Sequence, residues 1–104
     1  MKKEQICSFI YYNCKGKSKA LGSSKIEQML RLSSNELRKQ INRLRRDGVP
    51  IASDSDGYYF AANAAEVYST IRSLSKMRDG IDSAIKGLER AMDKFSALSG
   101  GDAG

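Results

Sequence analysis

Apolar residues in the first half of the chain recur at intervals of three and four, which is the spacing of one face of an α-helix. This spacing predicts three helices, over residues 3–12, 24–30 and 33–47. A Ser-x-x-Glu pattern, in which a hydroxyl and a carboxylate bind free amide groups at a helix start, opens the second helix at Ser24 and the third at Ser33. Because only a short turn separates these two helices, they predict a helix-turn-helix.

The third helix carries apolar and basic side chains on opposite sides. Its narrow apolar stripe consists of Leu37, Ile41 and Leu44. With about 100° of rotation per residue, the other side carries Asn35, Arg38, Lys39, Asn42, Arg43 and Arg46. Gly48 and Pro50 predict its end. Side chains of these types read base edges and bind phosphates, so this face indicates either a nucleic-acid surface or an ordinary solvated helix face.

The segment after this helix has the pattern of a β-hairpin. Residues 49–61 contain two short strands around the turn Asp54–Gly57, with Gly where a positive φ is needed. One hairpin alone is marginally stable in water, so we expect it to pack against the helices through Ile51 and either Tyr59 or Phe60. Three helices followed by a hairpin predict a winged helix-turn-helix, a mainly α fold of the α+β type with a two-stranded wing.

The pattern Asn63-x-x-Glu66 predicts the start of a long last helix. The apolar positions of this helix alternate at intervals of four and three, a heptad repeat made of Val67, Ile71, Leu74, Ile81, Ile85, Leu88, Met92 and Phe95. Arg78 fills the one gap, and with Gly80 it leaves open whether the helix is continuous or breaks there. The chain thus divides into a winged domain, a heptad helix and a tail expected to be disordered, over residues 1–62, 63–98 and 99–104.

A helix of roughly thirty residues is near 45 Å long, longer than so small a domain can cover. It either folds back on its own domain or pairs with a second copy of the chain. A sustained heptad repeat favours a partner helix, so we predict a homodimer through Ile71, Leu74, Ile81, Ile85, Leu88 and Met92.

The net charge of +6 is unevenly distributed along the chain. Residues 1–49 hold twelve Lys and Arg against four Asp and Glu, a net charge of +8, whereas residues 50–104 hold six against eight, a net charge of −2. A basic half of this kind predicts a polyanionic partner. The predicted contacts to phosphate are Lys15, Lys17, Lys19, Lys25, Ser33, Arg43 and Arg46. The lysines of the loop at 15–22 are equally consistent with a solvated loop.

Several classes of function are disfavoured by what the chain lacks. It contains two cysteines, Cys7 and Cys14, and no His, which excludes Cys/His catalysis and makes a poor set of zinc ligands. No cofactor motif is present, so we expect no enzyme, no cofactor and no metal. No apolar run approaches the ~20 residues of a membrane span, and no signal peptide is recognisable. We therefore expect free thiols in a reducing, cytoplasmic protein.

Residues 45–61 read Arg-Arg-Asp-Gly-Val-Pro-Ile-Ala-Ser-Asp-Ser-Asp-Gly-Tyr-Tyr-Phe-Ala. They resemble the R-x-x-G-x-P-I-x-S-x-x-x-G-Y-Y-x-A segment of small winged-helix proteins of phages and prophages, which are distantly similar to the DNA-binding domain of the biotin repressor. The resemblance implies that bases are read by Ser34, Asn35, Arg38, Lys39 and Asn42, with the wing tip at residues 53–57. One departure is that the tip offers Asp54 and Asp56, which phosphates repel, where Lys or Arg is usual.

These patterns together predict a protein that binds double-stranded DNA with a preference for sequence. It would be a phage- or prophage-type regulator of transcription or replication that acts as a homodimer. The alternative is a winged-helix adaptor, whose acidic wing and last helix contact a host or phage protein. A simple observation distinguishes the two functions. A DNA-binding protein would be retained on DNA or heparin, whereas an adaptor would co-purify with a protein partner.

Overall fold

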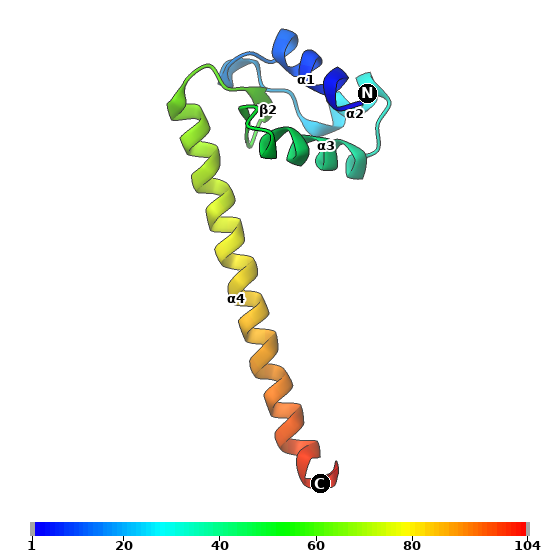
Figure 1. Ribbon diagram of the computed structural model, residues 1–104, viewed down its shortest axis with the longest axis vertical. Coiled ribbons are helices and arrows are strands. Elements are labelled where there is room, and N and C mark those ends of the chain that lie inside the picture. The colour runs from blue at the N-terminus through cyan, green and yellow to red at the C-terminus, as the bar shows by residue number, and fades with distance from the viewer. Residues whose placement is uncertain (1, 104) are drawn as a thin grey trace. The chain divides into compact units, whose positions relative to one another are not determined.

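The computed structural model describes the backbone of residues 2–103 and the side chains of residues 3–95. Contacts divide the chain into two units, Met1–Ile71 and Arg72–Gly104. In chain order the elements are α1 (Lys2–Asn13), a 3-10 helix η1 (Lys17–Lys19), α2 (Ser23–Leu30), α3 (Ser34–Arg46), β1 (Ile51–Asp54), β2 (Gly57–Phe60) and α4 (Ala64–Ala103) (Figure 1). The predicted disordered tail, residues 99–104, lies outside the residues whose side chains are described.

The fold class is as predicted. The described residues form four α-helices and one two-stranded antiparallel sheet, with the long helix last. In the first unit, α3 contacts both α1 and α2, and its C-terminal end contacts β1. The order of helices and hairpin is that of a winged helix-turn-helix.

The core of the first unit collects the apolar face of each element. α3 contributes Leu37, Ile41 and Leu44, the stripe predicted from its spacing, and all three are buried. The other buried apolar residues of the core are Ile6, Ile10, Cys14, Ile26, Ile51, Ala52, Tyr59 and Ala61. Burying this stripe fixes which side of α3 faces outward.

Local signals set both ends of α3. The Ser33 hydroxyl accepts a hydrogen bond from the amide of Glu36 at 3.1 Å, which confirms the predicted cap. At the other end Gly48 has a φ of 88°, its amide donates to the carbonyl of Arg45, and the amide of Val49 donates to the carbonyl of Leu44. This pair of bonds is a Schellman ending, which needs the left-handed backbone that glycine adopts without strain.

The predicted cap of the second helix is wrong. α2 begins at Ser23 rather than after Ser24, and Gly22 occupies the cap position without a side-chain hydrogen bond. The Gly22 carbonyl accepts from the amides of Lys25 and Ile26, at 3.1 and 3.2 Å. Because these backbone bonds already start the helix at Gly22, Ser24 lies within the first turn. The loop over 15–22 also contains η1, which no sequence pattern predicted.

Strand β2 is hydrogen-bonded on both of its edges. β1 and β2 pair in the register Ile51↔Phe60, with Tyr59 as the buried aromatic residue. On the far side of β2, Tyr58 and Leu21 exchange both backbone hydrogen bonds, at 2.8 and 3.0 Å. A Cβ added at Gly57 would collide with the Leu21 carbonyl, so a side chain at this turn position is excluded by the loop. The wing is therefore anchored to the loop as well as to the core.

α4 is continuous through Arg78 and Gly80, so the helix does not break at the position that the sequence left open. Its start is capped as predicted, since the Asn63 side-chain oxygen accepts from the amide of Glu66 at 2.9 Å. The Glu66 carboxylate in turn accepts from the amide of Ala62 at 2.8 Å. In the part of the chain that the structure describes, no helix combines the length and apolar content required to cross a membrane.

Candidate nucleic-acid interface

The outer face of α3 presents the residues predicted to read bases. All five side chains are exposed: Ser34, Asn35, Arg38, Lys39 and Asn42. Since the buried stripe holds the opposite side of the helix in the core, these side chains form one polar surface with no apolar residue exposed among them. The structure therefore brings together the predicted base-reading set on a single rigid element.

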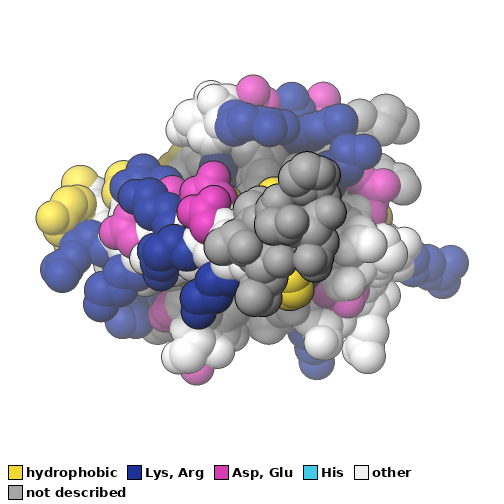
Figure 2. Space-filling model, turned by 90° about the horizontal axis from the view of Figure 1, so that it is seen from below, with side chains coloured by type: hydrophobic (Ala, Val, Ile, Leu, Met, Phe, Trp, Pro, Cys, Tyr) yellow, Lys and Arg dark blue, Asp and Glu magenta, His cyan; other side chains and the backbone are white. Residues whose placement is uncertain are grey.

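The predicted phosphate contacts are also exposed, but they come from several elements. Arg43 and Arg46 lie in the second half of α3, and Ser33 is its cap. The remaining residues lie in the loop before α2 or in its first turn: Lys15, Lys17, Lys19 and Lys25. Figure 2 shows Lys and Arg side chains spread across the face of the molecule seen there, with Asp and Glu side chains among them.

Lys15 is held in place by aromatic rings. Its Nζ lies 4.0 Å from the centroid of the Tyr11 ring and 5.3 Å from that of Phe60. A cation over an aromatic face is attracted by the ring quadrupole while its outer side stays hydrated. The Ser33 hydroxyl oxygen is occupied by the Glu36 amide, so what Ser33 has left to offer a phosphate is its hydroxyl proton.

Arg45 has a structural position that the sequence did not reveal. Its Nε donates to the carbonyl oxygen of Ile51 at 2.8 Å, and its Nη2 donates to the Ser53 hydroxyl at 3.1 Å. The guanidinium also lies 5.8 Å from the centroid of the Tyr58 ring. Burial lowers the pKa of Arg45 from its ordinary value. Arg45 thus connects α3 to the wing, whereas Arg46 beside it is exposed.

A second connection ties α1 to the end of α3. Lys3 Nζ lies 2.8 Å from Oδ2 of Asp47, the cap residue of α3. This hydrogen bond is the largest cause that raises the pKa of Lys3 and lowers the pKa of Asp47. Both side chains are partly exposed, so the pair contributes little to stability.

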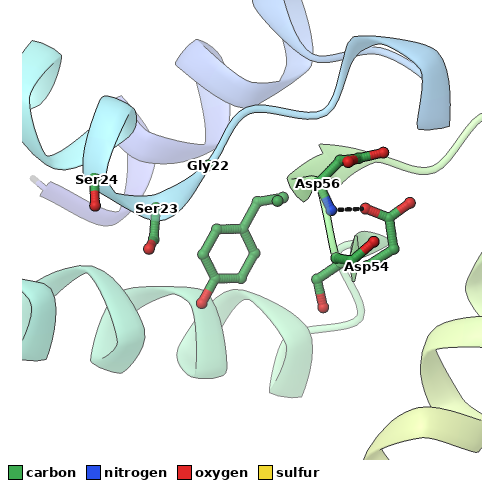
Figure 3. A pocket seen from close by; sticks show the side chains of 9 residues that line it. Gly22, Ser23, Ser24, Asp54 and Asp56 are labelled. Carbon is green, nitrogen blue, oxygen red and sulfur yellow. Dashed lines mark hydrogen bonds between the residues drawn. The ribbon is translucent and has the colours of Figure 1, made fainter.

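The wing tip is acidic and faces the start of α2. Asp54 Oδ1 accepts from the amide of Asp56 at 2.8 Å, which closes the turn. A polar hollow of about 430 Å³ lies between this turn and the first residues of α2, with Asp54 and Asp56 on one side and Ser23 and Ser24 on the other (Figure 3). Its lining contains no Lys or Arg. A phosphate would meet like charge here, so the tip is poorly suited to bind the DNA backbone.

Thr70 joins α4 to the wing within the first unit. This buried side chain accepts a hydrogen bond from the amide of Ser53 at 3.1 Å. Beyond it, the predicted dimerisation residues are exposed on the single chain, with exposed fractions between 39% and 68%: Ile71, Leu74, Ile81, Ile85, Leu88 and Met92. Their exposure leaves an apolar stripe of α4 uncovered in the monomer.

Neither cysteine forms a disulfide. Cys14 is buried, and burial raises the pKa of its thiol, whereas Cys7 is half-buried. Among the residues whose side chains are described, no group of His, Cys, Asp and Glu is placed to hold a metal ion. Comparison with known protein families, with curated proteins and with solved structures finds no match to this chain.

Proposed function

We propose that this protein binds double-stranded DNA with a preference for sequence, with α3 in the major groove. The observation that carries the proposal is the outer face of α3, where five exposed polar and basic side chains lie on one helix held rigidly from behind. A major groove about 12 Å wide admits one α-helix. Arg and Lys suit guanine and phosphate, and Asn suits adenine.

The charge distribution supports the same proposal. The half of the chain that contains α3 carries the net charge of +8 derived above, and its exposed lysines and arginines flank the base-reading residues in sequence. Phosphate contacts of this kind supply a large share of the affinity for DNA and determine the register of the protein on the duplex. The resemblance of residues 45–61 to phage and prophage winged-helix proteins agrees with a regulator of transcription or replication in the cytoplasm.

The proposed role of the wing is support rather than contact. Asp54 and Asp56 repel phosphates. Strand β1 of the wing is hydrogen-bonded to Arg45 of α3 and to Thr70 of α4. In this proposal the hairpin fixes the orientation of α3, and the lysines of the loop replace the basic wing tip as the flanking phosphate contacts.

The test is a fluorescence titration of the full chain on a labelled mixed-sequence duplex at several salt concentrations. We expect binding at low salt that weakens as salt rises, with a slope of log K against log [salt] of about −0.9 for each phosphate neutralised. Absence of binding to any duplex at low salt would overturn the proposal. Selection of bound duplexes from a random-sequence pool then measures the sequence preference separately from this general affinity.

A second candidate function is an adaptor that binds another protein. The polar hollow beside the acidic wing tip and the uncovered apolar stripe of α4 favour this function. An adaptor without DNA binding predicts that heparin and DNA columns fail to retain the chain and that a protein partner is lost when the stripe is made polar. The exposed basic face of α3 has no role in that function, so DNA binding accounts for more of the structure.

A further inference from the structure

The exposed apolar stripe of α4 has two different flanks. The stripe consists of Ile71, Leu74, Ile81, Ile85, Leu88, Met92 and Phe95, and all seven side chains are exposed. With Arg78 included they occupy the two inward positions of a heptad repeat. One flank, next to Leu74, Ile81 and Leu88, is apolar or small: Met77, Ala84 and Ala91. The other, next to Ile71, Arg78 and Ile85, is polar and acidic: Ser75, Asp82 and Glu89.

A stripe of this length requires a cover. From Ile71 to Phe95 it extends about 36 Å along the helix. Soluble monomers rarely expose a contiguous apolar patch of more than a few hundred Å². The regular spacing, without a slip over three and a half heptads, matches the surface that another helix with the same repeat presents. A second copy of α4 carries this repeat by definition.

We propose that two copies of this protein associate through α4 in an antiparallel pair. In this pair Ile85 of each copy lies beside the partner's Ile81, and Arg78 of each copy lies beside the partner's Glu89. The proposal concerns self-association and does not depend on the proposed function in DNA binding.

The position of Arg78 decides the direction of the helices. In a parallel pair each inward residue faces its own copy, so the two Arg78 side chains would meet in the apolar seam with like charge and lost hydration. In an antiparallel pair the two Arg78 side chains lie at different heights along the seam and do not meet. Its exposed fraction of 76% and its long contact of 3.8 Å to Asp79 leave the guanidinium able to turn toward a partner.

The register follows from which residues need cover. Pairing Ile85 with the partner's Ile81 places Ile71 opposite the partner's Phe95 and Leu74 opposite the partner's Met92. Every residue of the stripe then has a counterpart. Sliding one helix by a heptad in one direction would require Val67 as a seam residue, but Val67 already packs against the core of its own unit. Sliding it by a heptad in the other direction would leave Ile71 and Leu74 without an apolar residue of the partner's stripe opposite them.

The flanks of the stripe agree with this register. In antiparallel pairs each flank meets the same flank of the partner. The small flank therefore brings the two Ala84 side chains together near the two-fold axis and Met77 beside the partner's Ala91, which permits close packing. Arg78 borders the acidic flank and lies one residue along the helix axis from the level of the partner's Glu89. Asp82 is held by Lys86 of its own helix at 3.1 Å, which reduces its repulsion of the other copy's Asp82.

The first experiment measures the dimer dissociation constant of the full chain by sedimentation. Arg78→Glu and Glu89→Arg are each expected to raise the constant about tenfold, which corresponds to a loss of about 1.4 kcal/mol of association free energy. The double variant Arg78→Glu/Glu89→Arg is expected to return it to within about threefold of the original. The matched control is Lys76→Glu, which makes the same charge reversal on the outer face of α4 and should leave the constant unchanged.

The second experiment tests the direction by cross-linking. When Met77→Cys chains are mixed with Ala91→Cys chains and oxidised, a disulfide between the two variants is expected, because the antiparallel pair places these positions together. A parallel pair separates them on opposite sides of the seam. The unsubstituted chain, which retains Cys7 and Cys14, supplies the background. Three results would each overturn the proposal: a monomer at 100 μM, a double variant that stays weak, or no mixed disulfide above background.

Discussion

The guanidinium of Arg45 donates a hydrogen bond of 2.8 Å to the carbonyl oxygen of Ile51, and this contact links the last turn of α3 to the first residue of β1. The same guanidinium reaches the Ser53 hydroxyl, two residues further along the strand. A planar guanidinium suits two acceptors on one strand, whereas an ammonium does not. Arg45 therefore holds α3 against the wing, whereas the six other exposed basic or amide side chains of α3 face water.

Arg45→Ala is expected to lower the free energy of unfolding by about 2 kcal/mol, because two hydrogen bonds from a half-buried charged donor are lost. Arg45→Lys should recover only part of this loss. The measurement is urea unfolding of the full chain followed by circular dichroism. Arg46→Ala, an exposed neighbour, is the control and should change stability by no more than about 0.5 kcal/mol. Equal effects of the two alanine variants would contradict the position assigned to Arg45.

Gly57→Ala is expected to destabilise the wing more than Gly48→Ala. Both glycines have positive φ, 131° and 88°, so either substitution strains the backbone by about 1 kcal/mol. Only at Gly57 does the new Cβ also collide with a carbonyl, that of Leu21. Hydrogen exchange should therefore show faster exchange of the Tyr58 amide, which bonds Leu21, in the Gly57 variant alone. Slow exchange of that amide in both variants would contradict the close packing of loop and wing.

Stability is expected to fall as the pH rises above about 9. Burial raises the pKa of Cys14 above its ordinary value of 9.0 and the pKa of Tyr59 above 10.0. Both groups hold their protons more tightly when folded, so the unfolded chain loses protons first and is favoured at high pH. The stability that they contribute is complete below pH 9 and is lost progressively above it.

The measurement is the urea midpoint at pH 7.5 and pH 10. Cys14→Ala removes the thiol, so this variant should lose less stability between the two pH values than the original chain, although it is less stable at both. An equal loss in the two proteins would show that Cys14 does not contribute to the pH dependence.

The parts of the fold that depend on neighbouring residues could be predicted from the sequence. Ser33 and Gly48 mark the ends of α3 because a cap hydroxyl and a left-handed glycine act within one turn of the helix. The exposed face of α3 followed from the buried stripe opposite it. The heptad repeat of α4 was likewise a local pattern.

The parts that depend on distant residues could not be predicted. The pairing of Leu21 with Tyr58 joins a loop to a strand across thirty-seven positions, and no local spacing encodes it. In the sequence, Arg45 is one of several arginines at the end of the helix and looks no different from Arg43 or Arg46. Only the folded hairpin places hydrogen-bond acceptors, such as the Ile51 carbonyl, within its reach. At Ser24 the local pattern was present but the backbone bonds from Gly22 determined the helix start, so the cap prediction was wrong.

Asn42→Ala is expected to reduce discrimination between DNA sites by roughly 5-fold to 150-fold, which corresponds to about 1–3 kcal/mol for one paired base contact. The side chain is exposed on α3, and an amide bonds adenine through two atoms. The measurement compares binding to the preferred site with binding to site variants at constant salt. Gln5→Ala, which removes an exposed amide from α1, is the control. Equal discrimination in both variants would remove Asn42 from the base-reading set.

Selection of bound duplexes from a random pool is expected to enrich an inverted repeat. Two copies related by a two-fold axis present identical α3 surfaces, so the preferred site should have the same symmetry, with half-sites separated by one or more helical turns. Arg78→Glu, which weakens the proposed α4 pair without touching α3, should shift the enrichment toward single half-sites and leave the bases within each half-site unchanged. Enrichment of an asymmetric site by both proteins would show that dimerisation does not organise DNA binding, while binding by α3 itself would still hold.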